Sequence, residues 1–368
     1  AQTAAELHGR YKQHVFDYAR EWPIRWAVIV SRGDATHLVS VISHLASDGV
    51  GVVTMLKDLA SRDPATGRAN GPPTGMQPLE LARLQASQAG RRQSDAALRY
   101  WERLLWVIPA RRFAGSADPR QTRFWQAYYD SPASQLAIQA VAARTGAETS
   151  TVLLAAFAVA LTQVTRINPA VVQVVVNNRF RRDLADVVSP ICHHNACVID
   201  VADVPFDQVI ARTWRAAVSA YKLGYYDPAG RDELVRRICR ERGAEVDLSC
   251  FVNDRRMHSR QEPAGPARTP DDIRVALPRS VLTWGGQWDG QGEKCYLFLN
   301  DVPGTVNYEL LADTHHLSPA DMEAILRGLE AALVQAALHP AAPACASSCA
   351  ADLTPADSRD GDRDAAPT

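Results

Sequence analysis

Two neighbouring segments that are apolar all round most constrain the fold of this chain. The first, TSTVLLAAFAVALTQVT (149–165), has a helical pattern with almost no polar face, which predicts a buried helix. The second, VVQVVVNNRF (171–180), opens with a continuous apolar run, typical of a strand covered on both faces. With 368 residues, 46% of them hydrophobic, the chain can bury a large core, and its length suggests about two domains or one two-lobed enzyme fold.

The charge balance gives no sign of a nucleic-acid surface. There are 40 Lys and Arg against 41 Asp and Glu, a formal net charge of -1, and no basic block stands out. No apolar run reaches the roughly 18 to 20 residues of a bilayer span. The first ten residues, AQTAAELHGR, lack the basic, apolar and small-residue order of a signal peptide. We therefore expect a cytoplasmic location and neither nucleic acid nor membrane as a partner.

The seven cysteines do not form the pattern of a disulfide framework, because they are scattered through a large chain. Their densest group lies in SPICHHNACVIDV, where Cys192, His193, His194 and Cys197 invite comparison with a zinc site. The group lacks a second ligand pair at a usual distance, and a β-strand would send His193 and His194 to opposite faces. We expect reduced thiols and no metal.

The first part of the chain predicts a hairpin followed by a helix. IRWAVIVS (24–31) and THLVSVIS (36–43) are β-rich, and the Gly-Asp between them marks a tight turn. His44 follows the second strand directly. The next segment, VGVVTMLKDLA (50–60), has apolar residues at helical spacing, and Asp48 stands where a helix start accepts an acidic cap.

A surface excursion and a further helix are predicted next. Residues 63–90 are rich in Pro, Gly, Ala and polar residues, which indicates a long irregular segment. SDAALRYWERLLWVI (94–108) has an amphipathic helical pattern, with Ser94 or Asp95 as its cap.

The rest of the chain alternates between strand and helix patterns. Strands are predicted at 123–130, 246–253, 294–300 and 305–313, and helices at 134–147, 206–221, 232–244 and 318–339. In the last helix, Ser318 is the expected N-cap and Pro319 the first helical residue. GGQWDGQG (285–292) precedes a strand and does not open a helix, which favours a hairpin turn over a phosphate loop.

The segment SHLASDG (43–49) carries the functional signal. Alone, His-x-x-x-Asp-Gly is weak, because a histidine at a strand end is more often a hydrogen-bonded structural residue than a base. With its flanking strand and helix and a distal Arg-bearing strand, it resembles the His-His-x-x-x-Asp-Gly signature of nonribosomal peptide synthetase condensation domains. These belong to the chloramphenicol acetyltransferase-like acyltransferases.

The resemblance covers roughly residues 15 to 338. PLELARLQASQAGRRQSDAALRYWERLL is similar to the family segment that ends in a Tyr-Trp helix. NNRFRRDLADVVSPICHHNACVIDV is similar to the stretch in which a Gly-Arg element precedes a Val-Gly-x-Phe-Val-Asn strand, and VDLSCFVN is similar to a later core strand. The order and spacing of these segments support the resemblance more than any one of them.

The resemblance implies a fold and a domain organisation. Two α/β lobes meet in a V around a central substrate tunnel, with an N-terminal lobe at 1–133 and a C-terminal lobe at 134–340. Residues 341–368 lack an apolar period and are expected to form a linker or disordered tail. The family also has a strand-and-helix region before the hairpin, so the N-terminal lobe is expected to be incomplete at its start.

The resemblance also assigns roles to individual residues. His44 matches the second signature histidine, the one assigned to chemistry. Asp48 matches the structural signature Asp, and Arg179 falls where its partner Arg is expected. Gly49 matches the signature Gly at the helix start, and Asn253 matches an Asn near the tunnel.

This chain departs from the family pattern at several positions. Ser43 stands where the family has its first signature histidine. Ser189 stands where Gly is usual, and His193 and His194 stand where Asn-Thr is usual. We expect the departures at Ser189, His193 and His194 to alter a bridge or a tunnel wall.

The implied chemistry is acyl transfer from a thioester to an amine or hydroxyl. A histidine with an ordinary pKa of about 6.5 can take the acceptor's proton near neutral pH. Backbone N–H groups at Gly49 and the helix start would stabilise the oxyanion, and Asn253 would add a hydrogen bond. No tightly bound cofactor is expected, because a carrier protein delivers the phosphopantetheine thioester to a small-molecule acceptor. The alternatives are a coenzyme A-dependent acyltransferase and a catalytically silent module that recruits a partner protein.

Overall fold

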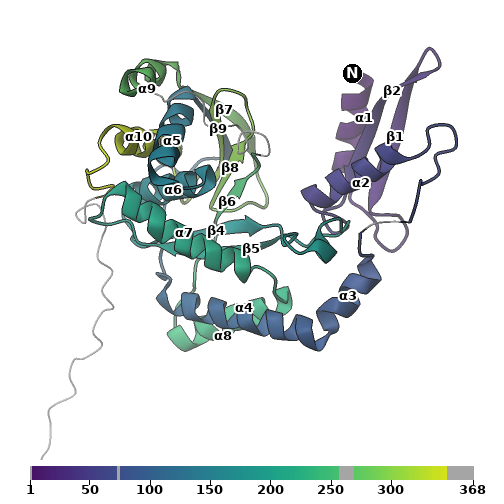
Figure 1. Cartoon of the computed structure of the whole chain (residues 1–368), viewed down its shortest axis with the longest axis horizontal. Coiled ribbons are helices and arrows are strands. Elements are labelled where there is room, and N and C mark those ends of the chain that lie inside the picture. Colours follow the sequence, from purple (N-terminus) through teal and green to yellow (C-terminus); the bar gives the residue numbers. More distant parts are fainter. Residues whose placement is uncertain (1, 73–74, 257–268, 346–368) are drawn as a thin grey trace, which may run out of the picture. The chain divides into compact units, whose positions relative to one another are not determined.

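The computed structural model describes residues 2–72, 75–256 and 269–345, in which groups of helices and strands follow one another along the chain (Figure 1). The chain divides into two compact units. Unit 1 comprises Ala1–Tyr100, Val175–Asn195 and Tyr221–Asp232, and unit 2 comprises Trp101–Val174, Ala196–Ala220 and Glu233–Thr368. These units are a different division from the lobes expected on either side of residue 133. That lobe boundary, the V shape and the tunnel stay predictions.

The described residues form these helices and strands. The helices are α1 (Gln2–Gln13), α2 (Gly49–Ser61), α3 (Pro78–Ala86), α4 (Gln88–Val107), α5 (Pro132–Thr145), α6 (Thr149–Thr165), α7 (Phe206–Lys222), α8 (Pro228–Arg242), α9 (Pro270–Ala276) and α10 (Pro319–Leu338). The strands are β1 (Ile24–Ser31), β2 (Asp34–Ile42), β3 (Phe124–Ser131), β4 (Ala170–Val176), β5 (His193–Ile199), β6 (Cys250–Asp254), β7 (Val281–Trp288), β8 (Cys295–Asn300) and β9 (Val306–Asp313).

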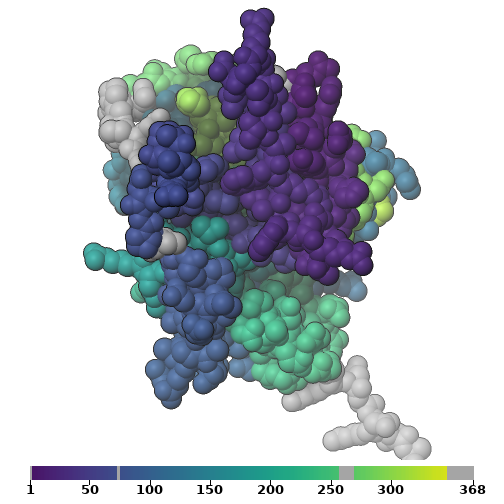
Figure 2. All heavy atoms as spheres, turned by 90° about the vertical axis from the view of Figure 1, so that its right-hand side faces the viewer, coloured from purple at the N-terminus to yellow at the C-terminus, as the bar shows by residue number. Residues whose placement is uncertain are grey.

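The predicted hairpin of unit 1 is confirmed. Strands β1 and β2 pair antiparallel from Ile24↔Ile42 to Ser31↔Asp34. Their turn has left-handed φ angles of 56° at Arg32 and 94° at Gly33, the backbone twist that two-residue hairpin turns require. The atoms of α1 and the hairpin, purple in Figure 2, lie at the surface of the face shown. Strand β2 leads into a turn at residues 44–46 and then into α2.

The surface excursion predicted at 63–90 is wrong in its second half. Helix α3 occupies part of it, with Pro78 in its first turn and a capping box between Gln77 and Glu80. Helix α4 begins at Gln88, before the predicted caps. Ser94 therefore lies inside the helix, where its hydroxyl accepts a hydrogen bond from the N–H of Asp227 at 2.9 Å.

The larger sheet has the strand order β5-β4-β6-β8-β9-β3-β7. Strands β4, β6 and β8 run parallel, and β9, β3 and β7 continue the sheet antiparallel. The apolar residues of β4 are almost all buried, as their continuous run predicts. Residues 151–162 of α6 are all buried too. Helix α6 packs against α10, where a Cβ added to Gly328 would lie 3.2 Å from the Cβ of Ala160.

One prediction about a loop is wrong. Within GGQWDGQG, Gly285 and Gly286 belong to β7, which pairs with β3 and not with β8, so the segment is not a hairpin turn between these two strands. The start of the expected tail is packed, because Pro343 bridges to Pro205 and the carbonyl of Cys345 accepts from Asp203 N–H at 2.8 Å. Residues 346–368 lie outside the described residues.

No single helix of the described ranges has both the length and the apolar composition of a membrane span. Helices α5 and α6 meet that test of length and composition only as a pair, bent by 113° at the break between them.

A buried carboxylate joins β3 to α10. Glu330 accepts hydrogen bonds from Tyr129 at 2.7 Å and Ser131 at 2.6 Å, and also from the hydroxyl of Ser280. Burial, followed by the hydrogen bond to Glu330, raises the pKa of Tyr129 to about 12. The phenol therefore stays a donor at neutral pH.

Glu330→Gln should lower the free energy of unfolding by about 1 to 3 kcal/mol, because an amide cannot accept all three hydroxyl hydrogens as the carboxylate does. Chemical denaturation measures this loss. Glu323→Gln on the exposed side of the same helix is the matched control and should cost less than about 1 kcal/mol. Equal effects of the two substitutions would contradict the role assigned to Glu330.

Candidate active site

Ser43 fixes the turn that presents His44. Its hydroxyl is buried, lies 2.8 Å from the Tyr18 hydroxyl and accepts the N–H of Leu45 at 3.2 Å. Its own N–H donates to the carbonyl of Pro23 at 2.9 Å. Ser43, at the position that carries a histidine in the family signature, is therefore a hydrogen-bonded junction between β2 and the turn. His44 follows at once, with an exposed side chain.

Asp48 anchors the other end of this turn. Its side chain is 2% exposed and caps α2 by accepting the N–H of Gly51 at 2.9 Å. The Oδ2 atom also accepts the N–H groups of Ile191 at 3.0 Å and Cys192 at 3.1 Å, just before β5. One carboxylate thus holds the His44 loop, the start of α2 and the start of β5 together.

Arg179 completes the set of donors around Asp48. Its Nη1 lies 2.9 Å from Oδ2 and its Nη2 lies 2.7 Å from Oδ1, a two-pronged ion pair within unit 1. Nη2 also donates to the carbonyls of Val187 and Ser189, each at 3.0 Å. Because the contact uses a backbone carbonyl, Ser189 makes it without a glycine.

These contacts decide the charge state of Asp48. Burial alone raises the pKa of a carboxyl group, but hydrogen bonds from Arg179 and Gly51 bring the pKa of Asp48 below its ordinary value. The stabilisation is present above the ordinary pKa of an aspartate and is lost as the pH falls through the lowered one. Asp48 is therefore ionised at neutral pH.

The glycine that this loop requires is Gly51, which the sequence did not single out. A Cβ at Gly51 would lie 2.3 Å from Ser47 Oγ, so a side chain would displace the Ser47 hydroxyl, which donates to the carbonyl of Asp48 at 3.2 Å. A Cβ at Gly49 would meet nothing within 4 Å. The oxyanion role of the Gly49 N–H stays a prediction.

The start of β5 brings two histidines to unit 1. The His193 ring stacks on Tyr225, with centroids 5.8 Å apart, and lies against Tyr226 at 4.7 Å. Burial, followed by the charge of Arg231, lowers the pKa of His193 to about 4. Burial and Arg231 lower the pKa of His194 to about 4 as well, with smaller contributions from His193 and His44. Both imidazoles are neutral at pH 7.

Asn178, also missed, holds the segment that carries Arg179. It has a left-handed φ of 56°, and its side-chain N–H groups donate to the carbonyls of Ile191 at 2.8 Å and Gly224 at 3.2 Å. Asparagine tolerates this backbone region. The paired Asn in VVVNNRF, directly after a buried strand, is the sequence signal that would have indicated it.

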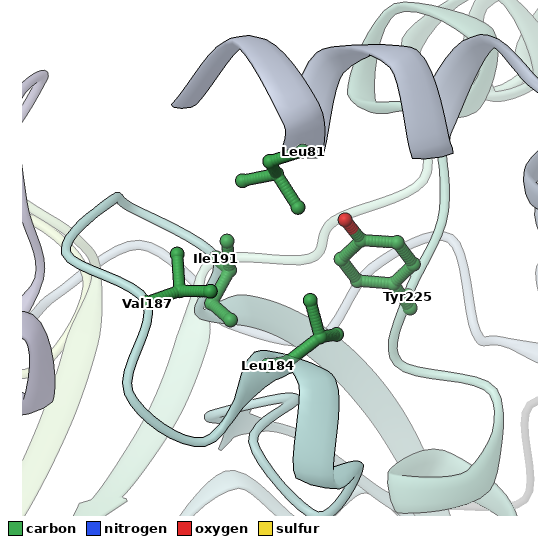
Figure 3. Packing of buried hydrophobic residues seen from close by; sticks show 5 residues of the cluster. All are labelled: Leu81, Leu184, Val187, Ile191 and Tyr225. Carbon is green, nitrogen blue, oxygen red and sulfur yellow. The ribbon is translucent and has the colours of Figure 1, made fainter. Parts of the chain in front are cut away.

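An apolar cluster lies behind the Asp48 contacts. Figure 3 shows the side chains of its members turned toward one another: Leu81, Leu184, Val187, Ile191 and Tyr225. Val187 and Ile191 also supply backbone atoms to the Arg179 and Asp48 contacts. Helix α3 contributes Leu81, so the helix missed from the sequence supports the site.

Asn253 lies in unit 2, half-buried on β6 and in register with Phe298 on β8. Its part in substrate binding stays a prediction. Among the residues that the structure describes, no three His, Cys, Asp or Glu side chains gather where they could hold a metal ion.

The ion pair of Asp48 with Arg179 and the exposed His44 lie in a part of the chain that matches a family model. The model of the Condensation domain family matches residues 1–242. The chain belongs to the condensation domain family. Members of this family are, in general terms, acyltransferases of the condensation type in nonribosomal peptide and polyketide systems.

Individual proteins match this chain over a short stretch or at low sequence identity. A stretch of 117 residues is 32% identical to the "Probable non-canonical nonribosomal peptide synthetase (NRPS) CymA" of Salinispora arenicola (strain CNS-205), covering 30% of this chain and 2% of that protein. The structure of the condensation domain that mediates chain release from the enacyloxin polyketide synthase superposes with a TM-score of 0.66 at 19% identity, over 92% of this chain and 65% of that one. The teicoplanin X-domain gives 0.66 at 17% identity, over 92% and 78%. These likenesses confirm the predicted chloramphenicol acetyltransferase-like α/β fold.

Asp48→Asn should lower the free energy of unfolding by about 3 to 5 kcal/mol, because it leaves the buried Arg179 guanidinium without its counter-charge. Denaturant titration of the wild type and the variant measures the loss. Asp58→Asn on the same helix removes an exposed pair with Arg62 and should cost less than about 1 kcal/mol. A cost for Asp48→Asn no larger than that of Asp58→Asn would refute the anchoring role.

His193 should make stability fall as the pH drops from about 6.5 to about 4. The unfolded chain binds a proton at this residue in that range and the folded chain does not, so acid favours unfolding, by on the order of 3 kcal/mol. His193→Phe keeps a ring against the two tyrosines and should reduce the slope of stability against pH in this range, leaving the contribution of His194. His37→Phe, at an exposed position, should leave the slope unchanged. An unchanged slope in His193→Phe would show that the residue does not titrate as described.

Proposed function

We propose that this chain forms an amide or ester bond between a carrier-protein-bound acyl or aminoacyl thioester and an amine or hydroxyl acceptor, in nonribosomal peptide or related natural-product biosynthesis. The observation that carries the proposal is an exposed histidine on a loop whose far end is held by a buried, five-fold hydrogen-bonded aspartate. A side chain needed only for packing would not be presented to solvent at the end of such a loop. The family match supports the reaction type.

In the proposed reaction, His44 is the general base. Its imidazole takes the proton from the acceptor nitrogen or oxygen as that atom bonds to the thioester carbon. The carbon–sulfur bond then breaks, and the proton passes from His44 to the departing thiolate of the phosphopantetheine arm. A positioned base is worth about 10² to 10⁴ in rate. Asp48 and Arg179 keep its loop in place, Gly49 N–H offers a donor for the oxyanion, and Asn253 is proposed to bind substrate.

Two other functions have support. A coenzyme A thioester has the same phosphopantetheine arm as a loaded carrier, so coenzyme A as the donor is the nearer alternative. A catalytically silent module that recruits a partner is the second; Ser43 and the two histidines of β5 depart from the family signature, and the teicoplanin X-domain is known in a complex with OxyB. A cytoplasmic location and the absence of nucleic-acid and membrane partners stay predictions.

His44→Ala should lower acyl transfer about 10²- to 10⁴-fold, because it removes the base without touching the buried pair. The measurement is intact-protein mass spectrometry of carrier proteins loaded with a panel of acyl and aminoacyl groups, incubated with amino acids and amino alcohols as acceptors. The acyl mass should leave the carrier with the wild type and stay on it with His44→Ala. A parallel arm uses the matching coenzyme A thioesters.

His37→Ala is the matched control, since His37 is an exposed histidine on β2, the strand that leads into the His44 turn. It should transfer at the wild-type rate. Equal transfer by the wild type and His44→Ala would remove His44 from the chemistry. No transfer from either donor, together with stable binding of a carrier or partner protein, would contradict the proposed enzyme activity and favour the recruiting module.

A further inference from the structure

In unit 2, one face of the larger sheet is more open than the other and carries polar and aromatic side chains. A row of register partners crosses four strands and contains Asn253, Phe298, Glu309 and Tyr128. Partners in register lie on the same face of a sheet. The next residue of β3, Tyr129, is fully buried on the opposite face, where it binds Glu330 of α10. Asn253, Glu309 and Tyr128 are half-buried, so the row lies on the more open face, away from α10.

Arg255 lies beside this row. Its N–H donates to the carbonyl of Leu299 on β8 at 2.9 Å, which continues the pairing of β6 one residue past Asp254. Because Arg255 follows Asn253 by two residues, its side chain leaves on the same face. The guanidinium lies over the Phe298 ring, 3.6 Å from the ring centroid, and 46% of the side chain is exposed. Stacking on a ring uses the plane of a guanidinium and leaves its edge, where the N–H groups lie, uncovered.

The guanidinium of Arg255 has donors that are not used. Its Nη1 contacts Asn300 Oδ1 and Glu309 Oε2 at 3.5 Å each, which is long for a hydrogen bond. Within residues 2–72, 75–256 and 269–345, no atom accepts a hydrogen bond from its Nε or Nη2. Glu309 has shorter contacts of its own, because it accepts from Gln126 at 2.7 Å and from Asn300 at 3.1 Å. A ligand can therefore take Nε and Nη2 without displacing an existing partner.

The neighbouring Arg256 shows what these two nitrogens do when an arginine is structural. Its side chain is 3% exposed, and its Nε and Nη2 bind the two carboxylate oxygens of Asp254 at 2.9 and 2.8 Å. Such a fork of two parallel N–H groups matches the two oxygens of a carboxylate. Arg255 holds the same fork at an exposed position, unfilled by any described residue.

We propose that Arg255 is a substrate-binding residue that takes the carboxylate of the acceptor through Nε and Nη2, with the Phe298 ring as its support. The acceptor is then a small molecule with a free carboxylate besides its nucleophilic amine or hydroxyl, the class of amino and hydroxy acids. Asn253, on the same face, offers an amide to the rest of this molecule. The inference rests on the proposed function, which supplies the acceptor, and deepens it by naming the acceptor's class.

NMR titration of the full chain with benzoate tests the site without turnover, and benzamide is the uncharged analogue. Benzoate should shift the Nε–H resonance of Arg255 until the site is saturated, and benzamide should leave it in place. Arg255→Gln should bind benzoate at least about tenfold more weakly, because it loses the charge-assisted hydrogen bonds. The ring resonances of benzoate measure the affinity for both proteins.

Arg274→Gln is the matched control, since it removes a similarly exposed arginine of α9 in the same unit. It should bind benzoate as the wild type does. Thermal unfolding of both variants shows that the fold is intact, as expected for exposed side chains. A benzoate affinity of Arg255→Gln equal to that of the wild type, or no shift of the Arg255 resonance, would overturn the inference.

The carrier assay tests the role in transfer, with amino acids and their amides compared as acceptors. Arg255→Gln should lower kcat/KM for the amino acids about 10- to 100-fold and leave kcat/KM for the amides and the KM for the loaded carrier unchanged.

Two other results separate the inference from the proposed function. A raised KM for the loaded carrier, with the preference between acid and amide unchanged, would assign the fork of Arg255 to the phosphate of the phosphopantetheine arm. That result would overturn the inference and leave the proposed function standing. No transfer by the wild type, together with saturable benzoate binding at Arg255, would overturn the proposed function and support the carboxylate site.

Discussion

The ion pair between Asp48 and Arg179 is the interaction on which the proposed site depends. Burying two charges costs desolvation free energy, and further hydrogen bonds to the two groups offset part of that cost. Here the carboxylate accepts from two backbone N–H groups before β5 and one at the start of α2, while the guanidinium also binds the carbonyls of Val187 and Ser189. The pair therefore fixes three backbone segments in one arrangement: the loop into α2, the segment of Arg179, and residues 187–192 before β5. A hydrophobic contact of the same size would not specify this arrangement.

The three histidines nearest in sequence to the Asp48 contacts, His44, His193 and His194, divide into two kinds. His193 and His194 are held in surroundings that disfavour their charged forms, so they are fixed and neutral. His44 is exposed at the tip of the loop that the ion pair anchors. A general base must gain and lose a proton in each cycle, which burial without a counter-charge would oppose. Of these three histidines, His44 is the one suited to the proposed reaction.

Local patterns predicted the elements around the site better than its contacts. The hairpin, the His44 turn and the Asp48 cap follow from apolar alternation and cap chemistry, which act over a few residues. The partner of Asp48 lies 131 positions away along the chain, and only the family resemblance indicated Arg179. Helix α3 was missed because the Pro and Gly residues before it indicated an irregular segment. Its own helix-start signal, Gln77 and Glu80 as a capping box with Pro78 between them, was outweighed. Gly51 was missed because steric demand depends on Ser47 packed against it, which no spacing reveals.

The most direct test of this account is amide hydrogen exchange at Gly51, Ile191 and Cys192, the three residues whose N–H groups bind the Asp48 carboxylate. NMR would compare the wild type with Asp48→Asn, and the amides of the buried helix α6 measure the loss of global stability, against which any larger loss at the three amides is read. The account predicts that all three amides lose protection together, because one side chain holds the loop, the helix start and the strand start. Wild-type protection at Ile191 and Cys192 in Asp48→Asn would contradict it, since the His44 loop would then be held by something else.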